Sequence, residues 1–407
     1  MQGFTSPSVP NGSITNAKLA AGAVMSGNIA SGQVGWPHLS SGAVLSGSIA
    51  SGQVGQYALS NNSIYSGAIA SGQIATGQCD ITNNGGLVHQ WENILDNPQG
   101  KVTQRANGTM TGAFSYGACD RWKGKITGTL PAGTLGSAFP ITGVGNSSYG
   151  IGFLASITTS GTLVLRQYIE KKNAVKLLNR TGIFSLNFFN QSSNTATVTL
   201  NIYPQATTDD SGTDGTAMVG GNLGVAQNCA ASTAANFNSG AISFPSTTHG
   251  LIVEVIITIS NTVSSINFVF TDLQLQLGSS VTPCEERTFS EELRRCQRYF
   301  CSTFPYGTAP ADRAGYPGCL GMLAALSQTT GVYYRWQFPV VMRIAPGRLV
   351  YNPDSGAGTA GYWRGGGASI QPQFDATNSD NSYTIYGAAN FTAGIVYYIH
   401  ATADADF

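Results

Sequence analysis

The chain has 407 residues, a formal net charge of zero and only 10% charged residues, against about 25% in typical soluble domains. Glycine accounts for 51 residues, and β-branched residues outnumber the helix-favouring Glu and Lys, which indicates a mainly β protein of two or three domains. Without a basic patch or a long apolar run, neither nucleic-acid binding nor membrane insertion is expected.

The N-terminal region repeats every five residues. An aliphatic residue recurs thirteen times in phase, and the sequence around it is nearly copied at Ile29, Ile49 and Ile69. The thirteen positions are Ile14, Leu19, Val24, Ile29, Val34, Leu39, Val44, Ile49, Val54, Leu59, Ile64, Ile69 and Ile74. The start of the chain has neither the basic residues nor the apolar run of a signal peptide.

A period of five matches neither an α-helix nor a β-strand. One aliphatic side chain in five is too little to offset chain entropy within one chain. We therefore predict that residues 14–80 form a slender shaft in which three copies bury these side chains around an axis. A single-chain pentapeptide β-helix is an alternative that Pro37, Tyr57 and Asn62 do not suit. A disordered linker is another, although it has no reason to keep this register.

Residues 81–284 predict a β-sandwich or jelly-roll domain. Short apolar stretches with period-two alternation, as in Val198, Leu200 and Ile202, are separated by turns rich in Gly, Asp and Asn. The predicted strands are 125–129, 152–157, 162–168, 182–189, 195–203, 251–260 and 266–277. Trp122 is expected in the core of this domain.

A short helix is predicted within a connector spanning residues 285–302. Ser290 is a suitable N-cap, acidic residues follow in the first turn, and arginines come later, as the helix dipole favours. Phe289, Leu293, Cys296 and Phe300 fall on one stripe. We expect this stripe to pack on a neighbouring domain.

Residues 303–407 predict a C-terminal β-sandwich that forms the tip, with Trp336 in its core. Sugar binding requires aromatic faces together with polar partners for hydroxyls, and this region supplies both in loops rich in Gly and Pro. The candidate glycan contacts are Tyr306, Tyr316, Tyr351, Asp354, Tyr362, Trp363 and Arg364. Because Gly361 and Gly365 flank it, Trp363 is expected to be exposed; packing in a trimer interface is the alternative.

No catalytic, metal or cofactor motif is present in the sequence. The four histidines are scattered, and the seven cysteines form no CxxC pair, so we expect reduced thiols, as in a protein assembled in a cytosol. Asp209, Asp210 and Asp214 lack the alternation of a calcium loop, although a solvated turn and a Ca²⁺ site both remain open. The chain is not expected to be an enzyme.

Several motifs occur in an order that resembles a family of bacteriophage tail-fibre and tail-associated proteins. They are Asn93-Ile-Leu-Asp-Asn-Pro98, Cys119-Asp-Arg-Trp122, Phe184-Ser-Leu-Asn-Phe188, Leu273-Gln-Leu-Gln-Leu-Gly278, Thr282-Pro283, Glu291-Glu-Leu-Arg-Arg-Cys-Gln-Arg-Tyr-Phe300 and Phe338-Pro-Val-Val-Met-Arg343 with Pro346. Members of this family combine a jelly roll like that of carbohydrate-binding modules with a short helix and a C-terminal β-domain.

The resemblance implies a virion structural protein, assembled in the host cytoplasm and then located in the tail fibre. We expect a homotrimer whose segment 1–13 attaches to the tail or baseplate and whose distal domains bind a host surface polysaccharide. Two alternatives remain: a glycan depolymerase tailspike, whose carboxylates would come from distant strands, and a purely structural head or baseplate fibre without a receptor role.

Overall fold

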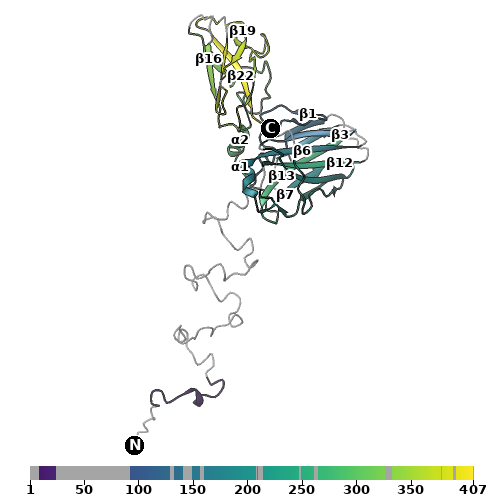
Figure 1. Cartoon of the computed structure of the whole chain (residues 1–407), viewed down its shortest axis with the longest axis vertical. Coiled ribbons are helices and arrows are strands. Elements are labelled where there is room, and N and C mark those ends of the chain that lie inside the picture. The colour runs from purple at the N-terminus through teal and green to yellow at the C-terminus, as the bar shows by residue number, and fades with distance from the viewer. Residues whose placement is uncertain are drawn as a thin grey trace, which may run out of the picture. The chain divides into compact units, whose positions relative to one another are not determined.

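The computed structural model describes residues 9–23, 92–128, 133–140, 149–155, 160–207, 209, 214–246, 249–260, 265–325, 332–376, 378–387 and 391–406 (Figure 1). Contacts divide the chain into two units, Met1–Asn83 and Asn84–Phe407. In the first unit Asn16–Lys18 form a 3-10 turn, and Ile14 and Leu19 are exposed in the single chain. The other predicted shaft positions lie outside the described residues, so the trimeric shaft stays a prediction.

Two antiparallel sheets of the second unit form a β-sandwich. The 7-stranded sheet contains β1 (Gly108–Met110), β4 (Gly133–Pro140), β5 (Tyr149–Ala155), β13 (Ile266–Leu277), β7 (Thr181–Asn190), β10 (Thr233–Asn238) and, paired with β7, β11 (Ile242–Ser243). The 6-stranded sheet contains β2 (Ser115–Tyr116), β3 (Lys123–Gly128), β6 (Gly161–Glu170), β12 (Gly250–Ile259), β8 (Ala196–Pro204) and β9 (Gln227–Cys229). Two short helical segments, α1 (Lys171–Ala174) and η8 (Val175–Leu177), connect β6 to β7.

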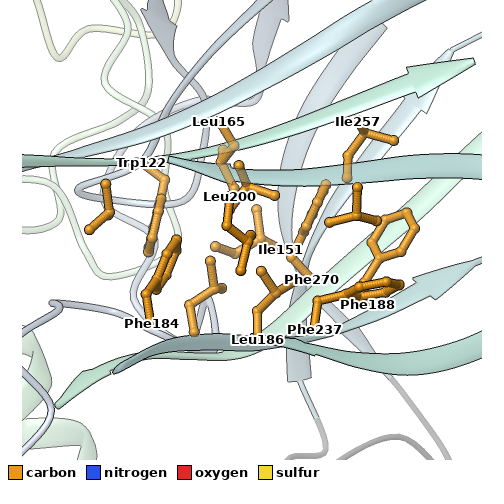
Figure 2. Close-up of a cluster of buried hydrophobic side chains, with 14 of the residues drawn as sticks. Trp122, Ile151, Leu165, Phe184, Leu186, Phe188, Leu200, Phe237, Ile257 and Phe270 are labelled. Atoms are coloured by element: carbon orange, nitrogen blue, oxygen red, sulfur yellow. The ribbon is translucent and has the colours of Figure 1, made fainter. Parts of the chain in front are cut away.

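The core lies between these two sheets, because alternate side chains of each strand point inward. Figure 2 shows Leu165 and Leu200 facing Phe184 and Leu186 across the sandwich, and all four are buried. Every predicted strand of this region is confirmed to within a few residues by β3, β5, β6, β7, β8, β12 and β13. Trp122 is fully buried, as expected.

The apolar run at 251–259 forms β12, which hydrogen-bonds to β6 on one side and β8 on the other. Both Ile252 and Val253 are fully buried although they point to opposite faces, because Ile252 packs with Tyr168 and Tyr299 on the face away from the core. Burial on both faces explains why this strand is apolar without alternation. No helix among the described residues combines the length and the apolar character needed to cross a bilayer.

The predicted helix is α2 (Phe289–Gln297), but two details of the prediction are wrong. Its N-cap is Thr288 and not Ser290: the Thr288 hydroxyl accepts from the Glu291 amide, and the Glu291 carboxylate accepts from Thr288 N, which makes a capping box. Phe289 is exposed, while Glu292 is buried because its carboxylate accepts from Asn97 N and Arg287. The buried side of α2 is therefore partly ionic.

The C-terminal region forms a second pair of antiparallel sheets. The 6-stranded sheet contains β14 (Phe300–Ser302), β22 (Val396–Asp404), β18 (Trp363–Gly365) and β19 (Ala368–Ile370), with β15 (Leu320–Leu323) and β17 (Gly347–Tyr351) also paired with β22. The 3-stranded sheet contains β16 (Val332–Gln337), β21 (Ser382–Gly387) and β20 (Pro372–Phe374).

A single apolar cluster joins these two sheets. Trp336, Tyr383 and Ile385 from the smaller sheet pack with Tyr397 and Ile399 of β22. The Tyr383 hydroxyl donates to Thr402 O at 3.0 Å across the layers. The chain is therefore mainly β, with antiparallel sheets that form two sandwiches, and Trp336 is a core residue as predicted.

Ion pairs connect the two sandwiches. Arg105 of the first lies 3.3 Å from both Asp404 and Asp406 near the C-terminus, and its guanidinium stacks 4.0 Å from the Phe300 ring. Arg298, which follows α2, donates two hydrogen bonds to Glu170 at 2.8 and 2.9 Å. These pairs hold the two cores in one compact unit.

Asp120, beside Arg105 in this junction, makes stability depend on pH. Burial raises the pKa of this carboxyl to about 7, an effect that Arg105 and hydrogen bonds from Gln104 offset only in part. The folded chain therefore binds the proton more tightly than the unfolded chain, whose aspartate pKa is about 3.9. The stabilisation that this proton gives the folded chain is complete below the pKa of Asp120 in the unfolded chain. It is lost as pH rises through the pKa of Asp120 in the folded chain.

We expect Asp120→Asn to remove this loss, because the amide does not titrate and its oxygen can still accept the bond from Gln104 Nε2. Between about pH 5 and pH 8 the free energy of unfolding of the wild type should fall relative to the variant by about 2–3 kcal/mol. Urea denaturation at each pH measures the difference. Two curves that run parallel over this range would contradict the prediction.

Candidate functional site

The structure does not bring the predicted glycan contacts together as one site. Tyr306 lies beside the first sandwich, where its hydroxyl contacts Lys101 and Thr103. Tyr316, Asp354 and Arg364 are neighbours within the C-terminal sandwich. Tyr351 packs edge-on against Phe304 at 5.4 Å, and Tyr362 is half-buried beside Trp363.

The expectation that Trp363 is exposed is wrong. It begins β18, pairs with Ile370 of β19, and has 0% of its surface exposed because it packs in the C-terminal core. Its indole N–H has no hydrogen-bond partner in the structure. A sugar cannot reach this ring in the folded chain.

Tyr316, Asp354 and Arg364 make a small cluster in which Tyr316 is exposed and the two charged residues are half-buried. Arg364 Nε donates to Asp354 Oδ2 at 2.7 Å, and this hydrogen bond lowers the pKa of Asp354. The Tyr316 ring meets Tyr398 edge-on at 5.3 Å. The two charges neutralise each other, so this cluster offers one exposed ring and few unused polar groups.

A cleft around Tyr306 has the geometry of a binding site. Its volume is about 390 Å³ and its walls are Lys101, Thr103, Tyr149, Phe289 and Tyr306. Of the three aromatic residues, Tyr149 keeps 46% of its surface exposed, Phe289 keeps 43% and Tyr306 keeps 49%. We call these five residues the aromatic cleft.

Three separate parts of the chain build the aromatic cleft. Tyr149 is the first residue of β5, Phe289 is the first residue of α2, and Tyr306 follows β14. The Tyr306 hydroxyl donates to Lys101 O at 2.7 Å and accepts from Thr103 N at 3.1 Å, and its ring meets Phe289 edge-on at 4.9 Å. The rings of Tyr306 and Phe289 are thus held in place before any ligand arrives.

The charge beside the aromatic cleft is balanced. Lys101 Nζ lies 2.8 Å from Glu286 Oε2, and Gln99 Nε2 donates to Glu286 Oε1 at 2.9 Å. Burial alone would raise the pKa of Glu286, but these hydrogen bonds outweigh burial and lower it. Partial burial raises the pKa of Tyr306, so its phenol stays a donor at neutral pH.

Sequence reasoning selected Tyr306 but missed Tyr149 and Phe289. Phe289 was assigned to the buried stripe of the helix, and Tyr149 precedes the predicted strand at 152–157. Nothing in the sequence indicates that these two rings meet Tyr306.

The remaining cysteine, histidine and aspartate residues singled out in the sequence do not form a second site. All six described cysteines are free of disulfide bonds, as expected, and Cys79 lies outside the described residues. His400 is buried, stacks 4.0 Å from Phe304, and has a pKa lowered by burial. Asp214 pairs with Arg166 at 2.8 Å, while Asp210 lies outside the described residues. Within the described ranges, no three His, Cys, Asp or Glu side chains gather as a metal site.

No family model and no curated protein matches the sequence. Among solved structures, the chain is similar to TmCBM61 in complex with β-1,4-galactotriose, at 13% identity over 46% of this chain and 99% of that chain, with a TM-score of 0.28. It is also similar to the C-terminal family 22 carbohydrate-binding module of Clostridium thermocellum Xyn10B, at 13% identity over 42% and 98%, with a TM-score of 0.29.

A third similar structure is the CBM22-1 xylan-binding domain of Paenibacillus barcinonensis Xyn10C, at 6% identity over 47% of this chain and 97% of that chain, with a TM-score of 0.28. All three are carbohydrate-binding modules by their descriptions. The TM-scores are low, so the function of this chain has to rest on its own residues.

Proposed function

We propose that this protein is the subunit of a homotrimeric bacteriophage tail fibre and that it binds a host surface polysaccharide without cleaving it. The aromatic cleft is the binding site. The observation that carries the proposal is the convergence of three exposed aromatic rings, from three separate parts of the chain, on one cavity of about 390 Å³.

The chemistry of the cleft suits a sugar ring. A pyranose presents C–H groups on its faces and hydroxyls around its edge, so it needs flat aromatic walls and a few polar groups. Tyr149, Phe289 and Tyr306 supply the walls, while Thr103 and Lys101 supply polar groups. Exposed aromatic surface of this kind is unfavourable in water and marks binding sites more often than chance.

The fibre part of the proposal rests on the pentad repeat and on the family resemblance. Ile14 and Leu19 are exposed in the single chain, and further copies would bury them in a trimer. Segment 1–13 would attach to the tail or baseplate, and the particle would be assembled in the host cytoplasm. Three copies per fibre would multiply a weak affinity at each cleft.

Binding without hydrolysis agrees with the charges around the cleft. Glycoside hydrolysis uses two carboxyl groups that flank the scissile bond. No described residue that lines the cleft is acidic, and the nearby Glu286 is paired with Lys101. Asp120 has the raised pKa of a general acid, but its side chain is buried, so a polysaccharide cannot reach it.

The test is Tyr306→Ala on an array of bacterial capsular polysaccharides, O-antigens and teichoic acids. We expect loss of one stacking surface to weaken binding by about tenfold or more, while light scattering gives a trimer mass for both proteins. Tyr316→Ala removes a similarly exposed ring elsewhere and should leave binding unchanged. No reducing sugar should be released from any bound polysaccharide.

Three results would contradict the proposal in different parts. A wild type that binds no polysaccharide, or a Tyr306→Ala protein that binds as well as wild type, would remove the cleft as a receptor site and favour a purely structural fibre. A monomer mass would exclude the trimeric fibre. Release of reducing sugar would support a depolymerase.

A further inference from the structure

The 3-stranded sheet of the C-terminal sandwich has one face in the core and one face exposed. Strands β16, β21 and β20 are antiparallel, and Tyr333 of β16 pairs in register with Tyr386 of β21. Because side chains alternate along a strand, Trp336 and Tyr383 enter the core while Tyr333, Arg335 and Tyr386 occupy the opposite face. We call this opposite face the outer face of the 3-stranded sheet.

Two stacked aromatic rings cover one end of the outer face. The ring centroids of Tyr333 and Tyr386 are 4.8 Å apart and their planes differ by 29°. Tyr333 nevertheless keeps 63% of its surface exposed, the largest fraction among the tyrosines that the structure describes. A stacked pair at this spacing presents a flat apolar platform to solvent.

Arg335 lies next to the platform, opposite Thr384 of β21. Its Nε and Nη2 donate to one hydroxyl, Ser382 Oγ, at 3.0 and 2.9 Å. No described carboxylate lies within ion-pair distance of it, in contrast to Arg364, which pairs with Asp354. The guanidinium is therefore oriented by a neutral group, and Nη1 keeps its hydrogen-bond donors for another partner.

A polar pocket continues from Arg335. Its volume is about 290 Å³, and it is lined by Arg335, Asp375, Asn378, Ser379, Ser382, Tyr383 and Thr384. Asn378 Nδ2 donates to Pro346 O at 2.8 Å, which fixes the amide, and Asn378 Oδ1 is buried without a hydrogen-bond partner.

We propose that the outer face of the 3-stranded sheet is a second carbohydrate subsite, which takes one pyranose residue of the polysaccharide. The ring stacks on Tyr333 and Tyr386. Its hydroxyls enter the pocket, where Arg335 Nη1 donates to them. The ligand class rests on the proposed function, but the residues are separate from the aromatic cleft.

Two subsites in one compact unit would favour binding of a polysaccharide over binding of a single sugar. A polymer that is long enough to reach from one subsite to the other would form the second contact at a raised effective concentration, whereas a single sugar gains nothing from it. The competing occupant is a second copy of this chain. The polar lining of the adjoining pocket argues against it, because its guanidinium, amide and hydroxyl groups match the hydroxyls of a sugar.

Tyr333→Ala tests the subsite, with Leu349→Ala as the matched control. Leu349 has the same exposed fraction, 63%, and belongs to the other sheet of the same sandwich. The probe is the array polysaccharide that gives the highest signal with wild-type trimer, measured by biolayer interferometry. We expect Tyr333→Ala to weaken binding about tenfold, Tyr333→Phe to bind normally, and Leu349→Ala to stay within twofold of wild type.

The outcomes separate this inference from the proposed function. If Tyr306→Ala weakens binding and Tyr333→Ala does not, the cleft stands and the second subsite is overturned. If only Tyr333→Ala weakens binding, the reverse holds. A Tyr333→Ala protein that loses its trimer mass would identify the outer face as a contact between copies and would also overturn the subsite.

Discussion

Replacing Arg121 with methionine is expected to lower the free energy of unfolding by about 3–5 kcal/mol, the range for removing one member of a buried ion pair. Arg121 is almost fully buried in the first sandwich. Its Nε donates to Asp96 at 3.2 Å, its Nη1 contacts Asp406 near the C-terminus, and its Nη2 donates to Tyr168 O at 2.5 Å. One guanidinium thus holds three acceptors from distant parts of the chain.

Methionine would occupy a similar length but donate nothing. Asp96 would keep Arg295 at 2.7 Å, and Asp406 would keep Arg105 at 3.3 Å. The lone pairs that Arg121 satisfied, together with Tyr168 O, would stay buried without donors, which is the main source of the loss. The guanidinium also stacks 3.3 Å above the Tyr299 ring, a contact that the uncharged side chain weakens.

Urea denaturation followed by intrinsic fluorescence measures this change, and limited proteolysis reports whether the C-terminal sandwich separates from the first. The matched control is Lys176→Met, which breaks the exposed Lys176–Glu92 pair and should cost about 0–1 kcal/mol. If the two variants lost equal stability, the junction would not depend on buried charge.

The first sandwich could be predicted well from the sequence because its signal is local. In β8, Val198, Leu200 and Ile202 alternate with half-buried residues, and all three are buried. In β12, most residues are apolar on both faces, with Glu254 and Thr258 as the polar exceptions, which is typical of a strand buried on both sides. A pattern of this kind depends only on neighbours along the chain, so it can be recognised without knowledge of the fold.

The site could not be predicted in the same way, because it depends on residues far apart in the chain. Tyr149, Phe289 and Tyr306 meet only after β5, α2 and the segment following β14 are placed. The same holds for Tyr333 and Tyr386, which are neighbours only through the register of two strands. Composition identified the C-terminal region as rich in tyrosine, but not which rings converge.

The glycines beside Trp363 misled the prediction for a specific reason. They suggested a flexible loop, whereas position 365 requires glycine because β22 passes next to it. A Cβ at this position would collide with Val396 O and Tyr397. Gly361 has φ +72°, which marks a turn. Close packing and chain reversal, both features of ordered structure, gave the sequence its loop-like composition.

Trp363→Ala is therefore expected to unfold the C-terminal sandwich and not simply to remove a sugar contact. Trp363 has no exposed surface and packs in the cluster that includes Tyr397 and Ile399. Truncating a fully buried tryptophan costs about 3–5 kcal/mol, because transfer energy is lost and a cavity remains. Any loss of glycan binding should follow the unfolded fraction.

Trp363→Phe is the informative partner of this variant. The indole N–H is buried without an acceptor, so phenylalanine removes an unsatisfied donor while keeping most of the apolar volume. We expect it to cost less than about 1.5 kcal/mol and to leave glycan binding unchanged. Urea denaturation and the polysaccharide array, measured on both variants, separate packing from recognition: a folded Trp363→Ala protein that fails to bind would return Trp363 to the binding surface.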